Sequence, residues 1–386
     1  MKNRIPALLL ALCLAASLFA GCAASTGDSA SSGGSGAPVI SGLHYASTLP
    51  LSYAKCFQVY RYEEGYDVIA VSDGRNYLVV PEGGRVPRGT GDYIVLKKPI
   101  QNIYLVATSA MSLVCALGGL DSVRLSGARQ EAWYVPEAAA AMADGTLLYA
   151  GKYSEPDYEL LVSENCELAI ESTMILHSPE VQEKIEELGI PVLIDRSSYE
   201  NHPLGRTEWI KLYGVLLDRE DEAETLFEKQ AKIVNDLSDF PNTEKTVAFF
   251  YVTNNGTVSV RKSSDYLAAM IELAGGRYIF DDLGDPNTAT SGVTMTMEEF
   301  YAGAKDADYL IYNAAIDDPL DSVSQLLAKS RLFADFKAVK NGNVWCTGKY
   351  LYQATDVLGS MISDIHTMLT GDGSQTELTF IHKLSQ

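Results

Sequence analysis

Apolar and polar positions follow two different periods along this chain, and the longest helical period lies near its middle. Over residues 203–237, apolar side chains recur every three to four positions and mostly charged side chains occupy the opposite face. This spacing predicts amphipathic helices. Charged residues from Asp218 to Asp221, three of them acidic, interrupt the stripe, so we expect two helices, the second from about Glu220 to about Leu237. At about 1.5 Å per residue, this second helix is about 27 Å long, enough to join two lobes.

Strand-like and helix-like segments alternate on both sides of this helical stretch. Before it, residues 102–107 predict a buried strand and residues 109–117 a helix, and similar segments follow up to residue 202. After it, the alternation resumes with the strand-like KTVAFFYV and ends with a helix near residues 356–369. Such alternation is typical of βαβ units in a mostly parallel sheet. We therefore expect an α/β fold in which two mostly parallel-sheet lobes are joined by a long helical connector.

Residues 41–98 show short strand-like runs in place of the helical period. Three β-rich runs, CFQVYRY, YDVIAV and NYLVV, are separated by turn residues around Gly65 and Gly74. Runs of this kind with glycine-containing turns predict β-hairpins. We expect an N-terminal β-hairpin segment that leads into the first lobe.

The N-terminus carries an export signal. Lys2 and Arg4 precede an apolar run, Ala7 to Ala16, that is too short to cross a bilayer, and the run ends in Leu-Phe-Ala-Gly before Cys22. This ending resembles a bacterial lipobox, although phenylalanine stands where leucine is usual. It predicts lipidation of Cys22; the alternative is an ordinary secretory signal with an incidental cysteine.

A chain of 386 residues exceeds the size that one hydrophobic core normally supports, so several domains are expected. The predicted organisation is a lipoprotein signal peptide (1–22), a flexible Ser/Gly/Ala-rich tether (23–40), the β-hairpin segment (41–98), an N-terminal α/β lobe (99–202), the helical connector (203–240) and a C-terminal α/β lobe (241–386).

Composition excludes some partners. The formal net charge of −20 argues against nucleic acid as a partner, because nucleic acid binding needs a basic face. Four cysteines remain after the signal peptide, namely Cys56, Cys115, Cys166 and Cys346, and they allow three disulfide pairings. The apolar surroundings of Cys115 and Cys166 favour buried free thiols over a disulfide.

From about Asp73 to its end, the chain resembles the helical-backbone class of substrate-binding proteins of ABC importers for iron siderophores, haem and vitamin B12. The matching pieces, in order, are Lys98-Pro99, NIYLVATSAMSLVCALGGLDSV, GKYSEPDYELLVSENCELAIES, EELGIPVLID, the helical connector, AFFYV, DYLAAMIELAGGRYIF, VTMTMEEFYAGAKDADYLIY and AVKNGNVW. They span roughly four-fifths of the chain. The resemblance implies a monomeric receptor that holds its ligand between two lobes with little closure and delivers it to an ABC permease.

In α/β proteins with parallel sheets, ligands bind beyond the carboxyl ends of the strands. The candidate ligand-binding residues follow the predicted strands: Thr108, Ser109, Arg129, Trp133, Tyr134, Met174, His177, Arg196, Tyr199, His202 and Arg206 in the first lobe, and Asn254, Arg261, Lys262 and Tyr266 in the second. Arginine offers paired donors to anions, and tryptophan and tyrosine offer stacking faces, so this set predicts an anionic or planar chelate. If each arginine instead pairs with a nearby acid, the neutral cleft suits a corrinoid better.

The resemblance also implies docking residues. In the vitamin B12 binder of this class, one glutamate on each lobe docks onto permease arginines, and the matching positions here are Glu159 in PDYELL and Glu298 in TMEEFY. Either residue also suits the first turn of a helix for electrostatic reasons alone. Tyr153 lies near the axial tyrosine of haem receptors of this class, but the arginine that accompanies that tyrosine is missing.

We therefore expect an exported receptor, lipid-anchored to the outer face of the cytoplasmic membrane, that captures a ferric siderophore. Cobalamin, another corrinoid or haem is the alternative ligand. No cofactor, catalytic residue or metal-ligating set is expected, since the isolated pair of His177 and Glu180 is a weak metal signal. An exported enzyme or ligand sensor on the same scaffold is the alternative of another class. The motifs GxSxG, HExxH, GxxxxGK[ST] and GxGxxG after a strand are all absent, which disfavours an enzyme.

Overall fold

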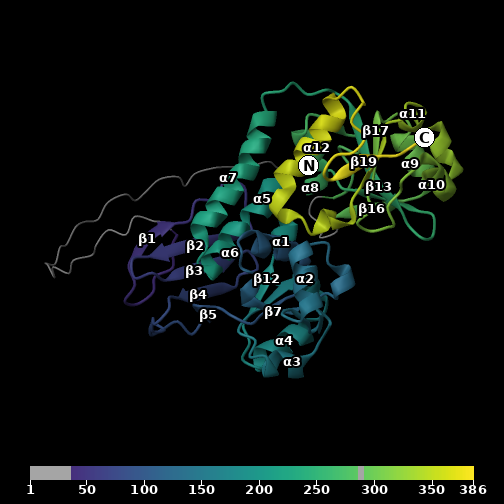
Figure 1. Ribbon diagram of the computed structural model, residues 1–386. Helices are drawn as coiled ribbons and strands as arrows, with labels where there is room; N and C mark the ends of the chain where they lie inside the picture. Colours follow the sequence, from purple (N-terminus) through teal and green to yellow (C-terminus); the bar gives the residue numbers. More distant parts are fainter. Residues whose placement is uncertain (1–35, 286–290) are drawn as a thin grey trace, which may run out of the picture. The chain divides into compact units, whose positions relative to one another are not determined.

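A computed structural model describes residues 36–285 and 291–386 (Figure 1). The expected signal peptide, Cys22 and most of the expected tether lie outside the described residues. Within the described residues, no helix combines the length and the apolar character that a membrane span needs.

The predicted hairpins form part of a five-stranded sheet. Its strands, in spatial order, are β1 (Tyr45–Thr48), β2 (Phe57–Tyr62), β3 (Asp67–Val71), β4 (Asn76–Val80) and β5 (Ile94–Lys97). β1 to β4 are antiparallel, and Gly65 and Gly74 adopt φ values of 78° and 90° in the two turns that the pattern predicted. β5 pairs with β4 in parallel, because residues 81–93 return the chain to the same end of the sheet before β5 begins.

The N-terminal lobe is a fully parallel sheet between two helical layers. Its strands are β6 (Ile103–Leu105), β7 (Val123–Ser126), β8 (Leu148–Tyr149), β11 (Ala169–Ser172) and β12 (Val192–Asp195), in the order β12-β11-β6-β7-β8. One face packs on α1 (Thr108–Ala116) and α2 (Pro136–Asp144), and the other face packs on α3 (Tyr158–Ser163) and α4 (Pro179–Glu187). The carboxyl ends of all five strands therefore lie along one edge of the sheet.

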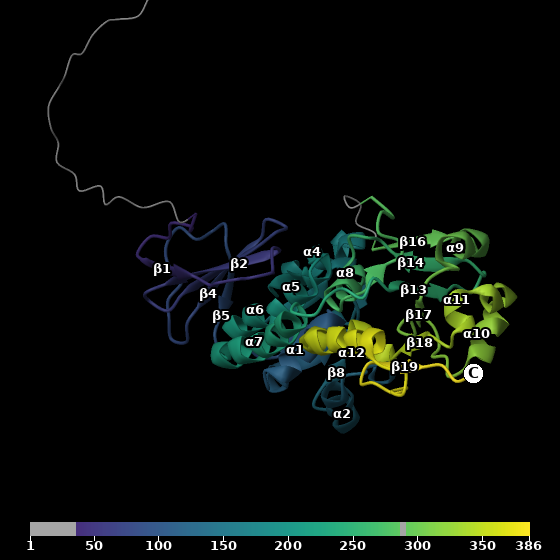
Figure 2. The same cartoon turned by 90° about the horizontal axis from the view of Figure 1, so that it is seen from above.

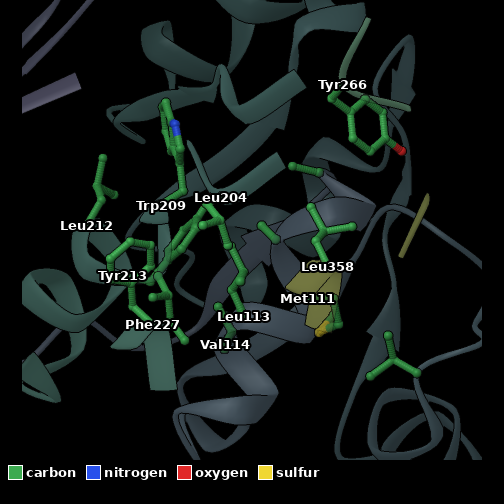
Figure 3. Packing of buried hydrophobic residues seen from close by; sticks show 14 of the residues in the cluster. Met111, Leu113, Val114, Leu204, Trp209, Leu212, Tyr213, Phe227, Tyr266 and Leu358 are labelled. Atoms are coloured by element: carbon green, nitrogen blue, oxygen red, sulfur yellow. The ribbon is translucent and has the colours of Figure 1, made fainter. Parts of the chain in front are cut away.

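The connector contains three helices, although the sequence predicted two. The first predicted helix is divided at Trp209 into α5 (Pro203–Glu208) and α6 (Ile210–Leu217), a break that the pattern hides because Trp209 continues the apolar stripe. The second is α7, Glu220–Leu237, as predicted. Leu204, Trp209 and Tyr213 are completely buried in one cluster with residues of α1 and with Phe227 of α7 (Figure 3). The connector is therefore part of the core.

The C-terminal lobe is a mixed sheet with helices on both faces. Its strands are β13 (Thr246–Val252), β14 (Val258–Arg261), β15 (Arg277–Tyr278), β16 (Gly292–Met295), β17 (Tyr309–Tyr312), β18 (Val344–Thr347) and β19 (Ile381–Lys383), in the order β16-β14-β13-β17-β18-β19 with β15 beside β13. β13, β15, β17 and β18 run parallel, and the other three strands run antiparallel to their neighbours. One face packs on α8 (Tyr266–Leu273) and α12 (Leu358–Thr370), and the other packs on α9 (Met297–Ala304), α10 (Val323–Lys329) and α11 (Lys337–Lys340).

A single apolar cluster extends from the N-terminal sheet through the connector into the C-terminal lobe. In this cluster α12 lies beside α7 (Figure 2). The two helices approach closely at Gly359, where a Cβ atom would lie 2.5 Å from the carbonyl oxygen of Gln230. Separating the lobes would expose apolar surface at a cost of about 25 cal/mol per Å². We therefore expect the lobes to move little relative to each other.

Candidate functional site

The carboxyl edge of the N-terminal sheet gathers many of the predicted ligand-binding residues. Thr108 and Ser109 follow β6, Arg129 follows β7, Met174 follows β11 and Arg196 follows β12. The strands that lead to Arg129 and Arg196 are three places apart in the sheet, or roughly 14 Å. Thr108 and Ser109 begin α1 between them, and this helix start has no side-chain cap.

The two lobes meet beside this edge. The side chain of Gln353 accepts a hydrogen bond from the amide of Tyr134 and donates one to the carbonyl oxygen of Ala132, both at 2.8 Å. The amide of Thr355 donates to Oγ of Ser112 at 3.1 Å. These bonds link the segment after β18 to the segment after β7 and to α1.

A pocket of about 270 Å³ lies at this junction. Ser112, Tyr134 and Glu137 line it from the N-terminal lobe, and Tyr350, Gln353 and Asp356 line it from the C-terminal lobe. Burial raises the pKa of the Asp356 carboxyl. Of the predicted ligand-binding residues, Tyr134 is the one that faces this pocket.

Three of the predicted arginines stack on tyrosine rings. The guanidinium carbon of Arg129 lies 4.2 Å from the ring centre of Tyr149, that of Arg196 lies 4.5 Å from Tyr199, and that of Arg206 lies 3.6 Å from Tyr266. Within the described ranges, none of these arginines forms an ion pair with a carboxylate, whereas Arg261 does. The Nε atom of Arg196 is buried and has no acceptor there. The three guanidinium groups therefore lack a direct ion pair among the described residues, although Arg206 acts electrostatically on the buried carboxyl of Asp195.

Arg206 also joins the lobes. Its guanidinium, from α5, covers the ring of Tyr266 at the start of α8. Burial raises the pKa of Tyr266, which keeps this phenol neutral. Next to it, Arg261 forms two hydrogen bonds with Asp265, at 2.8 and 3.0 Å, and lies 5.9 Å from the ring centre of Tyr352. Arg206 and Arg261 thus share one aromatic cluster, in which the charge of Arg261 is balanced.

Other predicted residues have different surroundings. The ring of Trp133 is 5% exposed and its N–H donates to Oγ of Ser126 at 3.1 Å, so the indole belongs to the core beside the edge. Lys262 is 3% exposed and donates to the carbonyl oxygen of Asp285. His177 is exposed at the end of a short 3-10 helix, and Asn254 is exposed in the turn between β13 and β14.

His202 lies at the start of the connector, before α5. Its Nδ1 accepts a hydrogen bond from the amide of Leu204 at 3.1 Å and caps α5, and its ring stacks on Tyr53 with centres 4.5 Å apart. Burial lowers the pKa of His202, which keeps the ring neutral in this role.

Several residues around the predicted arginines and the pocket were not predicted. Tyr149 and Tyr352 contact arginines, Asn313 donates to the hydroxyl of Tyr352 at 2.8 Å, and Gln353 bridges the lobes. Asn313 directly follows β17, so the strand-end rule was sufficient to find it. Tyr352 ends the 3-10 turn Lys349–Tyr352 that follows β18, and Gln353 comes directly after it; the hydrophobic pattern does not reveal this turn.

The proposed docking residues are both exposed first-turn acids. Glu159 lies in α3 behind the N-cap Asp157, and Glu298 lies in α9 behind the N-cap Thr296. Each lobe therefore presents one of these carboxylates at its surface.

Metal and disulfide chemistry find little support in the described residues. Residues 36–285 and 291–386 contain no group of three or more His, Cys, Asp or Glu side chains arranged to hold a metal ion. Cys56, Cys115, Cys166 and Cys346 are free. Burial raises the pKa of Cys166 and of Cys346 to about 11, which keeps both as thiols. Tyr153 lies in the hairpin between β9 (Gly151–Lys152) and β10 (Glu155–Pro156) and packs partly on the core.

Comparisons with known proteins agree with this layout. The family model described as periplasmic binding protein matches residues 114–351. An uncharacterized lipoprotein of Methanocaldococcus jannaschii is 26% identical over 351 residues, which cover 83% of this chain and 81% of that protein. A periplasmic heme-binding protein of Vibrio cholerae aligns with a TM-score of 0.57 at 18% identity and covers 70% of this chain and 99% of its own. A periplasmic catecholate-siderophore-binding protein of the same species aligns with a TM-score of 0.56 at 12% identity and covers 70% and 94%. The predicted α/β fold of two lobes is confirmed.

Proposed function

The chain belongs to the periplasmic binding protein family, and from this membership we propose that it captures an anionic iron chelate, a ferric siderophore, between its lobes and delivers it to an ABC permease. Proteins of this family bind small solutes for ABC permeases and are not enzymes. Family membership supports the general role of a solute-binding protein. That the solute is a ferric siderophore is our inference from the arginine residues.

The observation that carries the inference is the set of arginine–tyrosine pairs. Arg129, Arg196 and Arg206 stack on aromatic rings and form no ion pair with the described carboxylates, although the chain carries a net charge of −20. Arg196 and Arg206 are half-buried, and a half-buried guanidinium group is costly without an anionic partner, whereas Arg129 is exposed. Carboxylate, catecholate or hydroxamate oxygens of a ferric chelate supply such partners, and each charge-assisted contact contributes about 1.5 to 3 kcal/mol.

The other ligand classes of the family offer fewer anionic groups to the three arginines. A corrinoid is largely neutral at its periphery and would leave several of the arginines without a partner. Haem offers two carboxylates and requires an axial ligand, and the candidate Tyr153 packs partly on the core of the N-terminal lobe. An anionic siderophore therefore suits the three arginines best.

The test uses single arginine substitutions. We expect Arg129→Gln and Arg196→Gln each to weaken the binding of a ferric tris-catecholate complex by about tenfold, equivalent to 1.4 kcal/mol, because each removes one charge-assisted contact. Isothermal titration calorimetry measures the affinities. The control is Arg277→Gln, which removes the same charge from a pair with Glu244 on an exposed surface. It should bind as the wild type does.

The same titrations separate the alternative ligands. Cyanocobalamin and haem are titrated beside the ferric complex. If cyanocobalamin binds tightly, and Arg129→Gln, Arg196→Gln and Arg277→Gln all leave its affinity unchanged, the siderophore is rejected and a corrinoid is favoured. Tight binding of haem that is lost in Tyr153→Phe would favour haem.

Lipid anchoring is a second part of the proposal. Two relatives in Methanocaldococcus jannaschii carry the name lipoprotein, and Cys22 follows small residues at the end of an apolar run. We expect Cys22→Ala to move the protein from the membrane fraction to the aqueous fraction with its ligand affinity intact, since only the anchor is lost. Cys13→Ala, a change inside the apolar run, should remain with the membrane. Retention of the Cys22 variant in the membrane would contradict the anchor.

A further inference from the structure

Two buried carboxylates hold the segment that leads into the N-terminal sheet. We name residues 52–56 the latch segment. The acceptors are Glu208, which is completely buried, and Glu200, which is 3% exposed. The amides of Ser52, Tyr53 and Ala54 donate to Glu208 at 2.7–2.8 Å, and those of Lys55 and Cys56 donate to Glu200 at 2.8–3.0 Å. Five successive backbone N–H groups therefore point at two anions.

The two carboxylates differ in what else they contact. Glu208 belongs to α5 and lies 3.5 Å from the ammonium group of Lys211, on the side of α6. Glu200 belongs to the loop of residues 196–202, which we name the cleft loop, and its side chain also accepts a hydrogen bond from the indole of Trp209 at 3.1 Å. Glu200 therefore connects the latch segment by hydrogen bonds to the loop that carries Arg196, and His202 of the same loop stacks on Tyr53.

The cleft loop in turn orients Arg206. The backbone carbonyl oxygen of Glu200 accepts a hydrogen bond from Nε of Arg206 at 3.2 Å, and that of Ser198 accepts one from a terminal guanidinium nitrogen at 2.6 Å. These two bonds turn the guanidinium plane onto the ring of Tyr266, in the C-terminal lobe. A chain of contacts thus runs from the latch segment through Glu200 to both Arg196 and Arg206.

The cleft loop has little regular structure of its own. It contains one short 3-10 turn, Ser197–Tyr199, whose last bonds are Tyr199 N–H to Arg196 O and Glu200 N–H to Ser197 O. Short 3-10 turns have poorer hydrogen-bond geometry than α-helices. Side-chain contacts therefore help to keep the loop in one conformation: the amide of Ser197 donates to the buried Asp195 at one end, and the Glu200 carboxylate accepts three N–H donors at the other.

We propose that the latch segment is a positioning device for the ligand cleft. Through Glu200 it holds the cleft loop so that Arg196 and Arg206 present their guanidinium groups to the ligand, and Glu200 is the positioning residue. The expected change in ligand affinity rests on the proposed function, because it requires an anionic ligand. The expected ordering of the cleft loop by Glu200 does not depend on the proposed function.

The test compares isosteric substitutions of the two glutamates that bind the latch segment. Glu200→Gln and Glu208→Gln each remove one negative charge and weaken hydrogen bonds to the latch segment. We expect Glu200→Gln to accelerate amide hydrogen exchange in residues 196–206 and to weaken binding of a ferric tris-catecholate complex by about tenfold, the loss expected for one charge-assisted contact. We expect Glu208→Gln to accelerate exchange in residues 49–56 and to leave the affinity unchanged.

A second variant covers the case in which Glu200→Gln does not fold. Glu200→Asp keeps the charge and shortens its reach, and it should give the same pattern with a smaller loss. Equal loss of affinity in the Glu200 and Glu208 variants would overturn the proposal, because the segment would then act through general stability. Unchanged affinity in a folded Glu200 variant would overturn it as well.

The design separates failure of the proposed function from failure of the positioning role. If the wild type binds neither the ferric tris-catecholate complex nor ferric citrate, the proposed function fails, and hydrogen exchange alone decides the inference. Faster exchange at residues 196–206 in Glu200→Gln but not in Glu208→Gln would then support positioning. Equal exchange in both variants would overturn it.

Discussion

Replacement of Glu171 by glutamine is expected to raise the free energy of unfolding at pH 9 by several kcal/mol. Glu171 lies on β11 in the sheet of the N-terminal lobe and is completely buried. Neither of its carboxyl oxygens has a hydrogen-bond partner among the described residues. Burial raises the pKa of this carboxyl from 4.5 to about 8. A charge at this position is therefore expensive, and glutamine has the same shape without the charge.

The sign of the pH dependence follows from this shift. The folded protein holds the proton of Glu171 to a higher pH than the unfolded chain does, so its contribution to stability is complete below pH 4.5. That contribution is lost progressively as the pH rises from 4.5 to about 8. A shift of this size corresponds to about 5 kcal/mol, as an upper limit. The wild type should lose more stability over this range than Glu171→Gln does, because other buried carboxyls such as Asp67, with its pKa raised to about 6, titrate in both proteins.

Urea unfolding at pH 5, 7 and 9 measures the effect. Tyr104, Tyr158 and Cys166 are the titratable neighbours of Glu171, and burial raises the pKa of each of them, so they remain neutral over most of this range. The control is Glu183→Gln in α4, which is exposed and should follow the wild type at every pH. Parallel pH profiles for wild type and Glu171→Gln would show that Glu171 has an undetected partner.

The sequence was sufficient to predict elements whose signal is local. The acidic first turn and the apolar stripe of α7 place both of its ends, and turn glycines at Gly65 and Gly74 place the hairpins of the N-terminal sheet. The alternation of strands and helices predicted the sheet of the N-terminal lobe, since a buried parallel strand is a continuous apolar run.

The strand-end rule found the three stacked arginines but not their partners. Whether Arg129 pairs with an acid or with Tyr149 depends on the order of β7 and β8 in the sheet, which no local pattern encodes. The pairing of Arg261 with Asp265 is different. Arg261 ends β14 and Asp265, four positions later, caps α8, so their salt bridge was within reach of the sequence.

The latch segment was beyond sequence reasoning for a physical reason. Its amides bond to Glu200 and Glu208 across separations of 144 to 156 residues. Backbone donors carry no side-chain signature, and a glutamate in an acidic chain reads as a surface residue until its burial is known. Contacts of this kind require the tertiary structure.

The last expected result concerns delivery to the permease. We propose that Glu159 and Glu298 dock onto basic residues of the permease, one from each lobe. Both are exposed acids in first turns of helices, and neither forms an ion pair within the described ranges. Glu159→Arg combined with Glu298→Arg should abolish uptake of the ferric complex, because like charges opposed across an interface cost several kcal/mol.

The matched control is Glu222→Arg combined with Glu228→Arg in α7, which changes the net charge by the same amount on exposed positions of the connector. Uptake of a radiolabelled iron complex into cells and calorimetric affinity of the purified proteins are measured together. The docking variant should bind its ligand as tightly as the wild type, since both glutamates are exposed on helices that cover outer faces of the two sheets. Normal uptake by the docking variant would reject the assignment of these two glutamates. Loss of uptake in both double variants would instead point to a general effect of charge on delivery.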